Sequence, residues 1–394
     1  MQRDPEYNRY DRAVAACLRA AVWQTPCDTD TAVLTDKAFW QAAYRQSCGH
    51  LLSVWAINNG LPVYNAVQQK AQVFAIYQRA MRQNRFLSDL VSVLRRNGVE
   101  TVLLKGYGLS LLYPVPEMRE YGDVDLYIGE GKYDTTLRVV RSAYPQAYWF
   151  SEEHVGHHFS MVLDEHCDLV AEFHNMAMDF PGMKKAEQAF AEFTRRELPS
   201  VRVISLNGTD IAIPDMRFNA LYVFVHAWHH FAGSGVGLRQ LADWMLCLHK
   251  LAETLTGKEQ QSYAHELESL LRQMSMLAVW QTFGCVLVRH LGLPTEEFPL
   301  YDAAYEPRGE KLWRQLLHDG HGYRSANRVS GVMVRSFPFA RPGKNRILQV
   351  FYTSGRILYD TFQMSKLFPC WAWRQCLGNI RLGFRKALKK TASV

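Results

Sequence analysis

Residues 101–126 read TVLLKGYGLSLLYPVPEMREYGDVDL, and this stretch decides the fold class. Residues 99–104, which are mostly apolar, predict a short strand that breaks at Gly106. A short helix is predicted over residues 107–113, and prolines at positions 114 and 116 end it. A second strand is predicted over residues 124–128. A strand, a glycine turn, a helix and another strand in this order indicate a sheet with helices packed on it.

Two carboxylates, Asp123 and Asp125, open the second of these strands. Side chains alternate across a strand, so both point to one face, about 7 Å apart along the backbone. Two ionised carboxylates so placed repel each other unless a divalent cation or a shared proton compensates, and we favour the cation. Glu172, in an expected neighbouring strand, would complete a site for two Mg²⁺ ions, with Mn²⁺ as the alternative. Taken alone, Glu172 could equally be a solvated strand residue.

Lys105 and Gly106 stand at the predicted strand-to-helix turn. Glycine permits close backbone approach, the following helix offers free N–H groups, and Lys105 adds a full positive charge. These features predict contact with the β- or γ-phosphate of a nucleoside triphosphate such as ATP. Residues 106–111 lack the third glycine of the dinucleotide motif G-x-G-x-x-G, and the phosphate-loop motif G-x-x-x-x-G-K-[ST] is also absent. We therefore reject both of those alternatives.

The composition is that of a folded chain with room for two or three domains. Of 394 residues, 48% are hydrophobic and 21% are charged, which argues against a mainly disordered protein. The longest apolar stretch, residues 276–288, is shorter than the roughly 20 residues that cross a bilayer. No secretory signal is evident at the N-terminus, so the expected location is the cytoplasm, or its membrane surface.

Eight scattered cysteines without a C-x-x-C pair indicate neither a zinc knuckle nor a disulfide framework.

Hydrophobic periodicity predicts an α+β fold, in which a mixed β-sheet is flanked by helices. Strands expected at residues 159–163 and 169–173 flank a polar turn and predict an antiparallel hairpin. Long helical patterns follow from residue 215 onward, including one over residues 260–292. The chain divides accordingly into an N-terminal helical region, an α+β core, a helical domain and a basic helical tail: residues 1–98, 99–214, 215–334 and 335–394.

The tail has an unusual charge. Residues 335–394 contain twelve Lys or Arg and one acid, although the net charge of the whole chain is only +7. Its apolar residues recur every three or four positions and predict an amphipathic helix: Trp373, Leu377, Ile380, Phe384 and Leu388. The commoner role of such a terminal helix is to dock on the protein with its charges solvated. The other is contact of residues 365–394 with an anionic partner, either RNA or a membrane surface.

The central motifs resemble the uncharacterised nucleotidyltransferase family of the polymerase-β-like nucleotidyltransferase superfamily, over residues 65–245. The likeness rests on these segments: residues 103–106, 113–114, Arg119, 122–126 and 172–174. The resemblance implies a mixed sheet with flanking helices, a glycine turn that binds the triphosphate, and Asp123, Asp125 and Glu172 as metal ligands and catalytic acids. The chain departs from the wider superfamily in two ways. It has Lys105-Gly106 where Gly-Ser is usual, and a longer gap before the aspartates.

Further residues have two interpretations each. Arg119 and His174 are expected to contact the nucleotide together with Lys105 and Gly106, although His174 could equally be a hydrogen-bonded strand histidine. His226 and His229, three residues apart on an expected helix, share a face that could hold zinc. Lining a cleft or capping buried polar groups is the commoner role of such histidines.

These observations lead to one main hypothesis and one alternative. The main hypothesis is a metal-dependent nucleotidyltransferase that moves a nucleoside monophosphate from a triphosphate to an acceptor hydroxyl or phosphate and releases pyrophosphate. The alternative is a non-catalytic nucleotide-fold module that acts through its basic C-terminal tail on nucleic acid or an anionic membrane. The sequence specifies neither the base nor the acceptor.

Overall fold

The structure is a computed structural model that describes residues 5–120, 122–150, 158–163, 169–233, 235–319 and 346–391. The chain forms two compact units whose segments alternate along the sequence. Unit 1 consists of the described residues within 1–179, 191–223 and 238–254. Unit 2 consists of those within 180–190, 224–237 and 255–394. The four-segment division drawn from the sequence stays a prediction.

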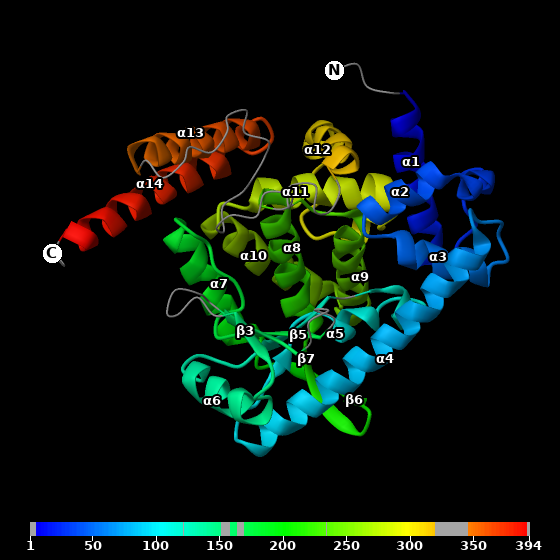
Figure 1. The fold of residues 1–394 in the computed structure, drawn as a ribbon. Helices are drawn as coiled ribbons and strands as arrows, with labels where there is room; N and C mark the ends of the chain where they lie inside the picture. Colours follow the sequence, from blue (N-terminus) through cyan, green and yellow to red (C-terminus); the bar gives the residue numbers. More distant parts are fainter. Residues whose placement is uncertain are drawn as a thin grey trace. The chain divides into compact units, whose positions relative to one another are not determined.

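Unit 1 begins with helices, as the periodicity of the first hundred residues predicts. They are α1 (Pro5–Trp23), α2 (Lys37–Arg45), α3 (Gly49–Asn58) and the long α4 (Ala66–Arg96). Asn65 caps the start of α4 with its side-chain oxygen, which accepts a hydrogen bond from the backbone N–H of Gln68. The C-terminal half of α4 buries one apolar face, and this face packs on the sheet (Figure 1).

Seven strands form one mixed sheet in the described part of the chain, in the order β3-β4-β5-β2-β1-β7-β6. In chain order they are β1 (Val102–Leu103), β2 (Asp123–Tyr127), β3 (Tyr148–Phe150), β4 (His158–Val162), β5 (Val170–His174), β6 (Val201–Leu206) and β7 (Thr209–Pro214). The β2–β5 and β1–β7 pairs are parallel, and the other pairs are antiparallel. The α+β class and the antiparallel β4–β5 pair are thus confirmed, while the turn predicted at residues 164–168 lies outside the described residues.

Four elements of this region were not predicted from the sequence: β3, the two strands of the β6–β7 hairpin, and α7 (Lys184–Glu197). The hairpin has a clear local signal, because Asn207-Gly208 stands between two alternating apolar runs. Both turn residues have positive φ, 50° and 78°, as a type I′ hairpin turn requires. The other helices of unit 1 are α5 (Tyr107–Ser110), α6 (Tyr133–Ala143) and α9 (Leu238–Thr254).

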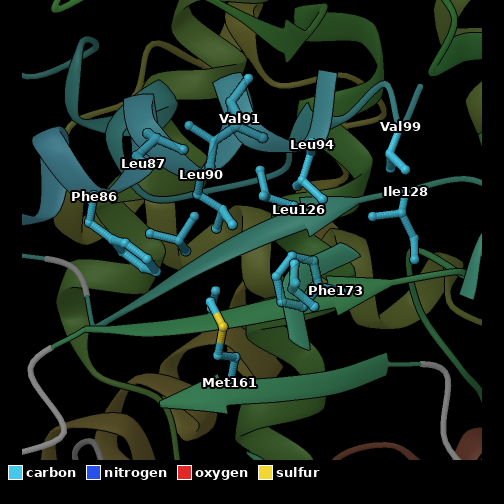
Figure 2. Packing of buried hydrophobic residues seen from close by; sticks show 14 of the residues in the cluster. Phe86, Leu87, Leu90, Val91, Leu94, Val99, Leu126, Ile128, Met161 and Phe173 are labelled. Atoms are coloured by element: carbon cyan, nitrogen blue, oxygen red, sulfur yellow. The ribbon is translucent and has the colours of Figure 1, made fainter. Parts of the chain in front are cut away.

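Alternation along β2, β4 and β5 separates an apolar face of the sheet from a polar face. Leu126, Phe173 and Met161 are fully buried in a cluster with Leu90 and Leu94 of α4. Figure 2 shows Leu90 and Leu94 pointing toward the strands that carry Leu126 and Phe173. Because neighbouring residues of a strand point to opposite faces, the residues between these anchors lie on the other side of the sheet. That polar face carries the acids.

Unit 2 is helical. It contains parts of α7 and α8 (Met216–Ala232), and then α10 (Gly257–Gln273), α11 (Leu277–Val286), α12 (Glu306–Asp319), α13 (Arg346–Ser365) and α14 (Pro369–Thr391). The single helix predicted over residues 260–292 is wrong, because the chain turns at Ser275, whose φ is +62°. A short turn joins α13 to α14, which pack side by side (Figure 1). No helix among the described residues is both long and apolar enough to cross a bilayer.

Candidate active site

The acids converge because β2 and β5 are parallel neighbours in register. Asp125 pairs directly with Glu172, so both side chains leave the same face of the sheet. His174, two residues beyond Glu172, shares that face and places its Nε2 atom 3.1 Å from Asp125 Oδ1 and 3.4 Å from Glu172 Oε2. Asp123 begins β2, two residues before Asp125, and the alternation of side chains puts both on the same face. Glu172 therefore lies beside the aspartate pair and not across the sheet from it.

Lys105 extends this cluster from the turn after β1. Its Nζ atom lies 2.9 Å from Asp125 Oδ1, and only 14% of its side chain is exposed. The backbone N–H of Leu104 donates to the carbonyl of Asp125 at 3.0 Å, which fixes the end of β1 against β2. Gly106 then adopts φ +63° and ψ −124°, a conformation that disfavours any side chain, and α5 starts at the next residue. The predicted strand, glycine turn and helix are all present.

The charges of the cluster oppose one another. Burial acts to raise the pKa of Asp125, but the Lys105 ammonium and the His174 imidazole outweigh it and hold the pKa below its ordinary value. The negative charge of Asp125, together with burial, raises the pKa of Asp123 to about 6. A cation bound beside these carboxylates would relieve the repulsion that raises the pKa of Asp123. The cluster thus holds more negative charge than its own cations neutralise.

The ligand atoms of Asp125, Glu172 and His174 lie within 4.8 Å of one another, which suits a bound metal ion. Ligands at right angles around an ion with bonds of about 2.1 Å are about 3.0 Å apart, close to the two distances that His174 makes. In the described residues this is the one group of three or more potential ligands that meets that spacing. His226 and His229 are not part of such a group. The donor set fits a divalent cation, with His174 among the ligand candidates and Asp123 beside them.

Arg119 has a different position from the one expected of a nucleotide contact. Its guanidinium is buried and donates to both carboxylate oxygens of Asp243 in α9, from Nε at 2.6 Å and from Nη2 at 2.8 Å. Nη1 donates to the backbone carbonyl of Gly106 at 3.1 Å. The Tyr113 hydroxyl donates to the same Asp243 carboxylate at 2.8 Å. Arg119 is thus placed to position the Gly106 turn, and direct nucleotide contact by Arg119 stays a prediction that this geometry does not support.

Two residues of this region were missed in the sequence. Asp243 lies 3.8 Å from Arg239 on its own helix, but its closer contact, at 2.6 Å, is with Arg119. Tyr222 of α8 is fully buried, and its phenol interacts electrostatically with Lys105 and with the acids of the polar face. Burial raises the pKa of its phenol. No local pattern marks either residue, because each acts through a segment that is distant in the chain.

The comparison with known proteins identifies the family of the chain. The sequence profile of a family described as "Uncharacterised nucleotidyltransferase" matches residues 39–283. The chain belongs to this family. It is therefore a nucleotidyltransferase, and the matched segment contains every predicted site residue from Lys105 to His174. That membership identifies the class of reaction, nucleotidyl transfer, but neither the base nor the acceptor.

Other comparisons of this nucleotidyltransferase add little. A search among curated proteins gives no match. A solved structure described as an antigenic nucleotidyltransferase-like protein from Paracoccidioides brasiliensis is 15% identical, with a TM-score of 0.33. The similarity covers 57% of this chain and 95% of that one. A likeness of that degree carries no argument about the site.

Proposed function

We propose that this nucleotidyltransferase binds a nucleoside triphosphate with Mg²⁺ or Mn²⁺ and transfers the nucleoside monophosphate to an acceptor hydroxyl or phosphate, with release of pyrophosphate. One observation carries the proposal: Asp125 and Glu172 are paired in register on parallel strands, with Lys105 at 2.9 Å from Asp125. Bound at this face, the divalent cation would neutralise charge on the α-phosphate and on the departing pyrophosphate. Asp123, Asp125 and Glu172 are its proposed ligands, and the position of His174 adds it to the set.

The remaining roles follow from reach and exposure. The side chain of Glu172 is 25% exposed, whereas that of Asp125 is 1% exposed, so Glu172 is the member of this pair that an acceptor can approach. It is placed to accept the proton of an attacking hydroxyl. Lys105 provides a positive charge for a phosphate oxygen that lies beside Asp125, and the Gly106 turn brings the first N–H groups of α5 close by.

Metal-dependent nucleotide binding tests the proposal without knowledge of the acceptor. Binding of a fluorescent ATP analogue, and of the corresponding GTP, CTP and UTP analogues, is measured with Mg²⁺, with Mn²⁺ and with excess EDTA. We expect at least one nucleotide to bind with metal and to be released by EDTA. The variants Asp125→Asn and Glu172→Gln should each weaken binding at least tenfold. Asp210→Asn, an exposed carboxylate on β7, is the matched control and should leave binding unchanged.

Transfer itself is then followed with α-labelled nucleotide in cell extract, where label moves to a larger species only if an acceptor is present. Folding of each variant is compared by circular dichroism. Nucleotide binding that EDTA does not weaken would contradict the proposed metal site, as would equal binding by wild type and by both acid variants.

A further inference from the structure

The C-terminal helix α14 packs on other elements of unit 2 through a face that its sequence pattern does not predict. Trp371 and Cys376 are buried, and the Trp371 ring lies 4.7 Å from the ring of Trp228 in α8. At Gly378 the helix backbone touches Gly182 so closely that an added Cβ atom would lie 1.9 Å from the Gly182 carbonyl oxygen. The contact is therefore made by tryptophan, cysteine and glycine.

The predicted apolar stripe of α14 is a different face, and it is exposed. Trp373, Leu377 and Ile380 expose 49%, 56% and 42% of their surfaces. We call these three residues the exposed stripe. The helix docks on the protein, as one of its two interpretations expects, but Trp371, Cys376 and Gly378 make the contact and the exposed stripe does not. The side chains of Phe384 and Leu388, which continue the spacing, lie outside the described part.

The neighbouring helix α13 adds to the exposed apolar surface. Leu358 and Phe362, one helical turn apart, are 51% and 58% exposed. Soluble proteins expose single apolar side chains routinely, but five large ones on two packed helices are a concentration that indicates a binding surface. This helix pair therefore has a surface suited to an apolar or partly apolar partner.

Charge decides which partner. Lys366 in the turn between α13 and α14 is exposed, as are Arg374 and Arg381 on α14, where Arg374 also donates a hydrogen bond to Ser275 Oγ. Residues 335–394 hold twelve basic residues against one acid, Asp360, which is buried. Such an excess attracts an anionic partner. RNA would be held through its phosphates, and that contact gives no reason for exposed aliphatic residues such as Leu377 and Ile380. An anionic membrane accommodates both features, since its headgroups attract cations and its acyl boundary accepts tryptophan, leucine and isoleucine.

We propose that the exposed stripe and the basic residues beside it bind the surface of an anionic membrane, so that the protein is a peripheral membrane protein. Trp373, Leu377 and Ile380 enter the boundary between headgroups and acyl chains, while Arg374 and Arg381 contact the headgroups. Both contributions are required, because one apolar patch or one basic patch alone gives only weak, reversible binding. The surface does not include the catalytic acids, so membrane binding and nucleotide binding are separable.

Vesicle co-sedimentation tests the proposal with the full-length protein. The vesicles contain phosphatidylcholine alone, or phosphatidylcholine with 30% phosphatidylglycerol, at 0.1 and 0.5 M NaCl. We expect at least tenfold tighter binding to the anionic vesicles, most of it lost at the higher salt. The double variant Trp373→Ser with Leu377→Ser should weaken binding about tenfold, and Arg381→Glu should weaken it several-fold on anionic vesicles only.

The matched control is Phe74→Ser with Met81→Ser, two apolar residues of α4 that are 64% and 69% exposed. This control should bind vesicles as wild type does, and all variants should keep wild-type circular dichroism and metal-dependent nucleotide binding. An equal loss in the control variant would overturn the proposal, as would equal binding to neutral and anionic vesicles. A labelled single-stranded RNA that binds tightly while anionic vesicles do not would overturn it in favour of an RNA-binding surface.

Discussion

Replacement of Asp243 by asparagine should lower the free energy of unfolding by several kilocalories per mole. The Asp243 side chain is 4% exposed and that of Arg119 is 5% exposed, so the change leaves a buried guanidinium without its counter-charge. Removal of one partner from a buried ion pair costs about 3–5 kcal/mol. Two of the hydrogen bonds from Arg119 and one from Tyr113 end on this carboxylate, and an amide can accept only part of them.

The control is an exposed pair of the same chemistry. Glu268 and Arg272 on α10 form a 2.6 Å contact, but their side chains are 37% and 64% exposed. Glu268→Gln should cost less than about 0.5 kcal/mol, because solvent screens exposed pairs. Urea unfolding followed by circular dichroism and by tryptophan fluorescence measures both variants. Agreement of the two probes would show that one free energy of unfolding describes the transition.

A third variant isolates the ion pair from other effects of the substitution. Arg119→Met combined with Asp243→Leu removes both charges, and at least about 2 kcal/mol of the loss should be recovered. A cost below about 1 kcal/mol for Asp243→Asn would refute the reasoning. Failure of the double variant to recover stability would also do so, because the loss would then not come from an unpaired Arg119.

The remaining predictions concern the cluster and a thiol. Lys105→Met should weaken binding of the fluorescent ATP analogue about tenfold in a titration. The change removes the ammonium group, 2.9 Å from Asp125, that is proposed to contact a phosphate oxygen of the nucleotide. Glu172→Gln should weaken Mn²⁺ binding at least tenfold in calorimetry, and unchanged Mn²⁺ affinity would remove Glu172 from the ligand set. The rate at which Cys27 reacts with iodoacetamide should rise with pH around a midpoint near 6. The hydrogen bond between the Cys27 and Cys17 thiols, 3.8 Å apart, lowers the pKa of Cys27 to about 6. Mass spectrometry of alkylated peptides from pH 5 to 9 checks this, and a midpoint near 8.5 would contradict it.

The sequence was most informative where local pattern controls structure. The spacing of Asp123 and Asp125 predicted one shared face, and the strand observed at Asp123–Tyr127 begins one residue before the predicted one. The sequence also showed an acid, Glu172, within an apolar strand. Its closeness to Asp125 could not be predicted in the same way, because it depends on the pairing of the two strands. Such local features could be read because alternation is a property of the strand itself.

Features that depend on distant partners could not be read in this way. Arg119 was assigned to the nucleotide because its only visible context was the motif, whereas its partner Asp243 lies 124 positions further along the chain. The break at Ser275 lacks a proline or glycine, so the periodic pattern ran through it. The docked face of α14 depends on the close approach of Gly378 to Gly182, which hydrophobic periodicity does not register. Each of these is a tertiary effect.

The five residues of β2 serve two environments at once, with Val124 and Leu126 in the core and Asp123 and Asp125 on the polar face. Insertion or deletion of a single residue in this strand would exchange the two sets, placing carboxylates in the hydrophobic cluster and leucine at the proposed cation site. Substitutions can change this enzyme gradually, but its central strand cannot change length by one residue without loss of folding and catalysis together. We therefore expect insertions and deletions to be tolerated only outside that strand.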